Sequence, residues 1–117
     1  MVSIAHSGSI TDVLGIRVGH YTDIKNATGC TVILCDPPST CGVDIRGASP
    51  GTGDTEMLHP LSVDRPINAI LLTGGSVFGL AANAGVIRYL TENKTGSPFG
   101  GVKVPLCPSA AVSYTHL

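Results

Sequence analysis

Apolar and polar residues alternate near the start of the chain. Residues 16–21 follow this two-residue period, which is typical of a β-strand with one buried face. A run rich in β-branched residues follows at residues 30–35, and the Asp-Pro-Pro-Ser sequence at residues 36–39 favours a turn after it. Because the two runs are close in sequence, we expect two neighbouring antiparallel strands.

A third strand is predicted at residues 40–46, where Asp44 and Arg46 are two positions apart and therefore share a face. This pair is either an exposed ion pair or part of a site, and the pattern leaves both interpretations open. Residues 47–53 are too rich in glycine and proline for a regular element, so we expect a loop. Asp54 is then predicted to cap a short helical turn that runs through Leu58 and ends at His59.

The middle of the chain predicts a strand, a tight turn and a helix in direct succession. The strand covers residues 67–73, the turn contains Gly74, Gly75 and Ser76, and the helix covers residues 77–90. Apolar helix positions recur every three or four residues and predict one buried face. These positions are Val77, Leu80, Ala81, Ala84, Ile87 and Leu90, whereas Asn83, Arg88 and Glu92 lie off that face. A last strand is expected at residues 102–107, at an edge or a bend because Pro105 interrupts it.

The turn at Gly74, Gly75 and Ser76 is the candidate site. It joins a strand to a helix, where backbone N–H groups and the helix dipole favour negative charge, so it could bind an oxyanion or a carboxylate. A dinucleotide fingerprint would require glycine at Ser76, a nucleophile elbow would require glycine at Phe78, and no phosphate-loop lysine follows. The alternative is that Ser76 only caps the helix, which is a common use of serine.

Composition and charge narrow the class of protein. The chain has 117 residues, of which 43% are hydrophobic and 13% charged, as in globular domains. The net charge is −1, so a basic surface for nucleic acid or for an anionic membrane is not predicted. No segment approaches the roughly 20 apolar residues that span a bilayer, and the first ten residues lack the features of a signal peptide. We therefore expect a cytoplasmic protein.

Cysteine and histidine do not form a convincing site in the sequence. The four cysteines contain no CxxC pair and are predicted to be buried or half-buried free thiols, with no bound metal; they are Cys30, Cys35, Cys41 and Cys107. His6 and His20 have no serine or cysteine at a spacing that indicates a nucleophile and its base. The residues alone therefore predict an α/β sheet domain and no specific reaction.

The amino-acid pattern of residues 112–117 differs from that of the sequence before them. They resemble one reading frame of a transposase adaptor used in shotgun sequencing. We therefore expect residues 1–111 to be native sequence and residues 112–117 to be a tail derived from the adaptor. Val112 is ambiguous, because a native valine could coincide with the adaptor frame.

Four blocks, in order along the chain, resemble the L-aminopeptidase/D-esterase (DmpA) family, which includes β-aminopeptidases. The blocks are ITDVLGIRVGH at residues 10–20, GCTVI at 29–33, VDIRGASPGT at 43–52 and NAILLTGGSVFGL at 68–80. The chain departs from the family pattern at Leu14, where proline is usual, and at residues 53–56, where the family usually has Arg-Glu-Thr-Asp. The lost arginine puts a charged contact of that loop in doubt.

The resemblance implies a specific fold and reaction. The fold is α/β (α+β), part of a four-layer αββα sandwich like that of ornithine acetyltransferase. In this family a precursor cleaves itself and frees a Ser or Thr that attacks an amide, without a cofactor, in an oligomer. The cleavage site of the family lies well beyond Ala111, so residues 1–111 match an incomplete first chain that is expected to be inactive alone.

Within that resemblance, the turn at Gly74, Gly75 and Ser76 is expected to contribute to substrate binding, and the substrates implied are small peptides, amino-acid amides or esters. Two other readings stay open. One is a non-catalytic α/β module that binds a small anion at the same turn, and the other is an acyltransferase on the same fold.

Overall fold

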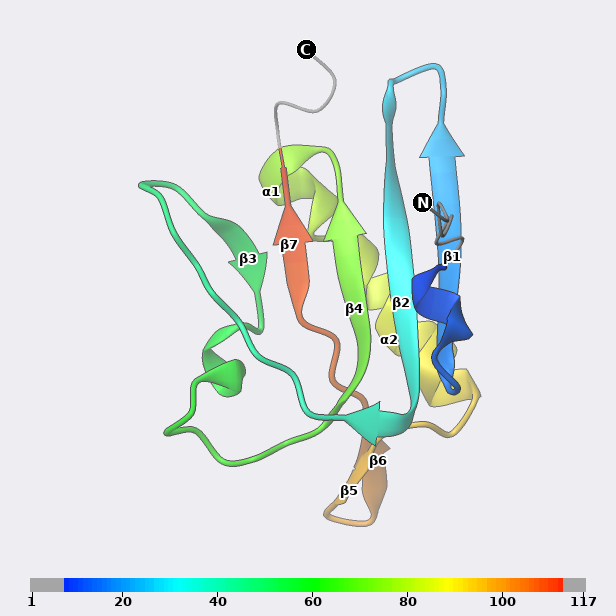
Figure 1. Ribbon diagram of the computed structural model, residues 1–117, viewed down its shortest axis with the longest axis vertical. Coiled ribbons are helices and arrows are strands. Elements are labelled where there is room, and N and C mark those ends of the chain that lie inside the picture. The colour runs from blue at the N-terminus through cyan, green and yellow to red at the C-terminus, as the bar shows by residue number, and fades with distance from the viewer. Residues whose placement is uncertain (1–7, 113–117) are drawn as a thin grey trace, which may run out of the picture.

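The computed structural model describes residues 8–112, which form a twisted sheet with helices on one face. Within these residues, one sheet has the strand order β1-β2-β4-β7-β3, and β5 and β6 form a separate hairpin. The bounds of the sheet strands are β1 (Ile16–Asp23), β2 (Thr28–Ser39), β3 (Gly51–Gly53), β4 (Ile67–Thr73) and β7 (Ser109–Ala111). The other elements are the 3-10 turns η1 (Ile10–Asp12) and η2 (Glu56–Leu58), the helices α1 (Ser76–Gly79) and α2 (Ala82–Glu92), and the hairpin strands β5 (Ser97–Phe99) and β6 (Val102–Val104). Figure 1 shows both helices behind the sheet, and the predicted mixed α/β (α+β) class is confirmed.

The first two strands pair as the sequence predicted. β1 and β2 are antiparallel, with a register that runs from Ile16 opposite Cys35 to Asp23 opposite Thr28. β4 begins and ends at the predicted residues and lies in the centre of the sheet. It is antiparallel to β2 on one side and parallel to β7 on the other.

The predicted turn at residues 36–39 is wrong, because these residues belong to β2. The peptide bond between Asp36 and Pro37 is cis, and the pairing of β2 with β4 shifts register between Leu34 and Ser39. The two prolines therefore interrupt the ladder without ending the strand, since Ser39 pairs again with Ile67.

The prediction for residues 40–46 is also wrong, because they form no strand. Both edges of β4 are occupied, by β2 and by β7, and residues 40–46 do not pair with β1 or β3, the edge strands of the described sheet. Instead, β3 forms inside the predicted loop and pairs with β7. Asp54 has a φ of 55° and does not cap the next turn, whose N-terminal cap is Thr55, whereas His59 follows the turn as predicted.

The predicted helix at residues 77–90 is broken into α1 and α2. The N–H groups of Leu80 and Ala81 donate to carbonyls three residues earlier, which tightens the chain between the two helices. The buried face of α2 is therefore rotated from the predicted one. Val86 and Leu90 are buried, whereas Val77 is 64% exposed, so the predicted stripe is correct only in part.

The core lies between α2 and the sheet. Its buried members are Ala69 and Leu71 of β4, Val86 and Leu90 of α2, and Cys107. Alternate residues of β2 pack against this cluster from the same side of the sheet: Cys30, Val32 and Leu34. Four of the five buried members therefore come from β4 and α2, the strand and the second helix of the predicted strand–turn–helix unit.

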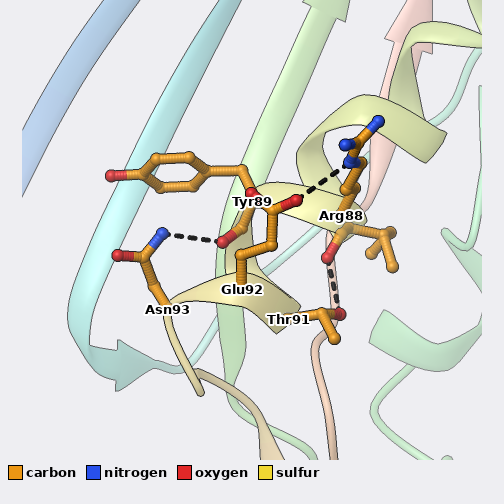
Figure 2. Close-up of polar contacts among 6 residues, drawn as sticks. Arg88, Tyr89, Thr91, Glu92 and Asn93 are labelled. Atoms are coloured by element: carbon orange, nitrogen blue, oxygen red, sulfur yellow. Dashed lines mark hydrogen bonds and ion pairs between the residues drawn. The ribbon is translucent and has the colours of Figure 1, made fainter.

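Asn83 was predicted to lie off the buried face, and the structure places it half-buried, in contact with the buried residues Cys107 and Ser109. Its Nδ2 donates to the Cys107 carbonyl at 2.7 Å and to Ser109 Oγ at 2.6 Å. By contrast, Arg88 and Glu92 form an exposed ion pair with 2.9 Å between Nε and Oε1, as Figure 2 shows. The polar residues of α2 therefore divide into a structural contact and a solvated pair.

The last predicted strand, at residues 102–107, is only half correct. β6 ends at Val104, and the chain then changes direction through Pro105 to run beside β4. Leu106 fixes this path, because its carbonyl accepts from Asn68 N and its N–H donates to Asn68 Oδ1, each at 2.9 Å. This path brings β7 into the sheet next to β4, a pairing that the sequence did not predict.

The face of the sheet turned away from α2 is called the open face here. The strand register places Val18, Ile33, Ile70 and Leu72 on it. Leu72 is 45% exposed, although it lies on the central strand. Of the predicted adaptor tail, residues 113–117 lie outside the described residues, as does His6.

Candidate functional site

The turn at Gly74, Gly75 and Ser76 connects β4 to α1, as predicted. Gly75 and Ser76 have φ angles of 83° and 56°, so both adopt the left-handed conformation. The N-terminal cap of α1 is Gly75, and no side chain makes a cap hydrogen bond there. The interpretation of Ser76 as the helix cap is therefore wrong, and a left-handed serine marks a backbone that the surrounding contacts must hold.

Close backbone contacts hold this turn. A Cβ atom at Gly79 would lie 1.8 Å from the Gly74 carbonyl oxygen, so that position accepts no side chain. A Cβ atom at Gly74 would lie 2.4 Å from Thr28 Oγ1. The glycines of the GGSVFG sequence therefore let the start of α1 fold directly back onto the end of β4.

The N–H groups of the turn are only partly available to a ligand. Gly74 N donates to the Gly29 carbonyl at 2.9 Å, and Ser76 N donates to the Val112 carbonyl at 3.0 Å. Among residues 8–112, the N–H groups of Gly75, Val77 and Phe78 have no acceptor. Of the three predicted residues, Gly75 alone keeps a free backbone donor within the described chain, and the other free donors belong to the first turn of α1.

A cavity of about 770 Å³ lies beside the turn. Its walls come from the hairpin of β1 and β2, from the end of β4 at residues 72–74, and from Ala110 and Val112. Gly74 lines this cavity, whereas Gly75 and Ser76 do not. The structure therefore divides the predicted site residues between the cavity wall and the helix start.

His20 and Thr31 form a contact in this cavity that the sequence reasoning missed. His20 Nδ1 and Thr31 Oγ1 are 2.8 Å apart, and the two residues are directly opposite each other in the register of β1 and β2. The sequence predicted the antiparallel pairing of these strands but not its register, and the register is what places the two side chains opposite each other. Within residues 8–112 His20 makes no second side-chain hydrogen bond, so the third group that orients a catalytic base is not present there.

Asp44 and Arg46 form the predicted ion pair, and both also line a cavity of about 450 Å³, so the interpretation as part of a site stays a prediction. Arg46 Nε lies 2.9 Å from Asp44 Oδ2, and the two side chains are 85% and 70% exposed, in that order. A pair so exposed contributes little to stability, about 0–1 kcal/mol. The structure is that of a surface ion pair.

The cysteines are free thiols that are buried or half-buried, as predicted. Cys35 and Cys107 are buried, and Cys30 and Cys41 are half-buried. Burial raises the pKa of the Cys107 thiol to about 12, with a further contribution from the negative charge of Asp54. Burial also raises the pKa of Cys35 and of Cys41, so these thiols are poor nucleophiles near neutral pH.

Residues 8–112 contain no group of three or more His, Cys, Asp or Glu side chains placed to hold a metal ion. None of the helices in this part of the chain has the length and apolar character that a membrane crossing requires. The arrangement therefore consists of a strained turn with a few free N–H groups, beside a cavity that contains one histidine.

Comparison with known proteins places this arrangement in a family. The sequence profile of Peptidase family S58 matches residues 8–110. Proteins named uncharacterized aminopeptidases from Mycobacterium bovis and Mycobacterium tuberculosis are each 46% identical over 113 residues, which cover 89% of this chain and 33% of those proteins. A protein of the same description from Mycobacterium leprae is 42% identical over 116 residues, which cover 92% of this chain and 32% of that protein. The chain thus spans about a third of the length of these relatives, and its match over residues 8–110 shows that it belongs to Peptidase family S58.

Proposed function

We propose that this chain is the front part of a DmpA-type aminopeptidase or amidase that cleaves itself to make its own nucleophile. The observation that carries the proposal is the match to Peptidase family S58 over residues 8–110. Relatives that are named aminopeptidases and are about three times as long support it. The parent protein would remove N-terminal residues from small peptides, amides or esters.

The open face supports the expected four-layer αββα sandwich. Its apolar side chains, including Ile70 and Leu72 of the central strand, lie opposite the face that α2 covers. An apolar sheet face is stable only when another layer covers it. In the proposal, a second sheet from the remaining two thirds of the parent protein packs on this face, with its own helices outside.

The nucleophile would be a Ser or Thr freed by self-cleavage beyond Ala111. Its terminal amine would accept the hydroxyl proton as the general base, and nearby N–H groups would stabilise the tetrahedral oxyanion. Gly74, Gly75 and Ser76 are proposed to shape the substrate pocket, with Gly75 N and the free donors of Val77 and Phe78 as the groups that could bind an oxygen. No cofactor is required by this chemistry.

The alternative of a non-catalytic anion-binding module is less well supported. It would have to use the same free N–H groups as the proposed pocket, those of Gly75, Val77 and Phe78, and the family match over residues 8–110 favours a peptidase. An acyltransferase on the same fold would share the self-cleavage and differ only in the acceptor, an amine in place of water. Product analysis separates it from a hydrolase.

The test uses the full-length protein expressed from the complete gene. We expect two chains on a denaturing gel, release of amine from aminoacyl amides, and loss of both when the new terminal Ser or Thr is replaced by Ala. A single uncleaved chain that releases no amine would contradict the proposal. Transfer of the acyl group to an added amine in preference to water would support the acyltransferase.

Gel filtration of the same sample tests the expected homo-oligomer, and cell fractionation tests the expected cytoplasmic location.

A further inference from the structure

A shallow apolar hollow lies between α2 and the edge of the sheet at β1. It has a volume of about 320 Å³ and is called the Gly19–Gly85 hollow after the two glycines in its walls. Val32 and Leu34 of β2 and Val86 and Tyr89 of α2 also line it. The hollow is separate from the open face, because Gly19 is paired with Val32 on the side of the sheet that α2 covers.

Neither glycine is required by its own backbone. Gly19 and Gly85 do not have positive φ angles, and a Cβ atom added at either position would meet no atom within 4 Å. Gly85 lies inside α2, where glycine destabilises a helix by about 1 kcal/mol relative to alanine. Gly19 lies inside β1, where glycine also weakens a strand and often marks the close approach of another segment. Both glycines therefore leave room that nothing in residues 8–112 uses.

Two aromatic side chains beside the hollow are partly exposed, as if the layer that would pack on them lies outside the described residues. Tyr21 flanks Gly19 on the same face of β1 and is 66% exposed. Tyr89 is 43% exposed at the rim of the hollow. Figure 2 shows its ring and the Arg88 side chain extending to opposite sides of α2, so the aromatic group lies toward the hollow and the charged group away from it.

We propose that the Gly19–Gly85 hollow is the docking site of the apolar face of a second helix, contributed by the part of the parent protein that lies outside these residues. The chain spans about a third of its relatives, so most of the parent polypeptide is available to supply it. Ala82 and Gly85 are three residues apart on α2, and small side chains at that spacing let another helix approach closely. The second helix would lie over Gly19, beside α2, and would complete the helical layer on this face of the sheet.

The test is photo-cross-linking in the full-length protein. A benzophenone amino acid replaces Tyr89 at the rim of the hollow, and in a control protein it replaces Arg88, whose side chain is 81% exposed. After irradiation and proteolysis, mass spectrometry should find Tyr89-position cross-links to peptides from beyond residue 111, and the Arg88 position should give few. Cross-links only between two copies, only within residues 1–111, or none at all would overturn the proposal.

A stability measurement gives a second, independent outcome. In an open hollow Gly85→Leu would stabilise α2, because leucine favours helix more than glycine does. In an occupied hollow the added side chain displaces the docked helix, so we expect the melting temperature of the full-length protein to fall by about 4 °C or more. The control is Ala84→Leu, on the exposed side of the same helix. This substitution should change the melting temperature by less than about 1 °C. An unchanged or raised melting temperature for Gly85→Leu would overturn the proposal. Both readouts are independent of hydrolysis, so they stand apart from the test of the proposed function.

Discussion

At the scale of single residues, Asn83 connects two parts of the chain that the sequence leaves 24 and 26 residues apart. Its Nδ2 donates to the Cys107 carbonyl, two residues before β7, and to Oγ of Ser109, the first residue of β7. Ser109 is buried, so its hydroxyl and the Cys107 carbonyl depend on protein partners instead of water. Asn83 therefore stabilises the position of β7 in the sheet.

We expect Asn83→Ala to lower the free energy of unfolding of the full-length protein by about 2 kcal/mol, because it leaves buried polar groups with fewer partners. Urea denaturation measures this change. Asn93→Ala is the matched control, since its Nδ2 donates to the Tyr89 carbonyl at an exposed helix end, and it should cost less than about 0.5 kcal/mol. Equal effects of the two substitutions would show that the buried contact has no special role.

At the scale of elements, the connection from β4 to α1 is tightly constrained by close contacts. A Cβ atom at Gly79 would clash with the Gly74 carbonyl, and one at Gly74 would clash with Thr28 Oγ1, so neither position tolerates a side chain without movement. The left-handed Gly75 and Ser76 lie between them, and Ser76 N is tied to Val112. The same contacts position the free N–H groups that the proposed pocket would use.

Gly79→Ala should therefore destabilise the full-length protein by at least about 2 kcal/mol, because the added methyl group displaces the Gly74 carbonyl. Thermal denaturation measures the loss, and the Michaelis constant for an aminoacyl amide should rise because the turn shifts. Gly42→Ala is the control, since Gly42 is exposed and a Cβ atom there meets nothing within 4 Å. A Gly79→Ala protein as stable as the control would show that the turn adapts freely.

At the scale of the whole molecule, the described residues have one covered sheet face and one open face. The open face includes the partly exposed Leu72, and the helix side includes the Gly19–Gly85 hollow. Exposed apolar surface of this kind favours association with another surface. Residues 8–112 therefore present two apolar surfaces, which in the two proposals the remainder of the parent protein would cover.

We expect residues 8–112 produced alone to fold poorly. They should bind the dye ANS, aggregate at micromolar concentration and give poorly dispersed amide NMR signals, because unpaired edges and uncovered apolar faces are left in water. Co-expression with the remaining two thirds of the parent protein should remove the dye binding. Sharp, well-dispersed spectra from the isolated residues would contradict this expectation.

The elements that the sequence predicted well are those whose signal is local. The alternation of β1, the apolar run of β4 and the glycines after it each act over a few residues, so the strand pair of β1 and β2 and the strand–turn–helix unit could be predicted. The glycine turn of the candidate site was found for the same reason. The family followed from short blocks in order along the chain.

The features of the fold and of the site that only the tertiary structure decided are those that depend on residues far apart in the sequence. Residues 40–46 have a strand-like pattern but pair with no strand of the described sheet, whereas Ser109–Ala111, with no strong pattern, lies in the sheet because Leu106 and Asn83 hold it beside β4. The pairing of His20 with Thr31, the break between α1 and α2, and the donors already used at Gly74 and Ser76 are of the same kind. Sequence pattern determines which face of an element is apolar, and only tertiary packing decides which partner covers that face and which backbone groups remain free.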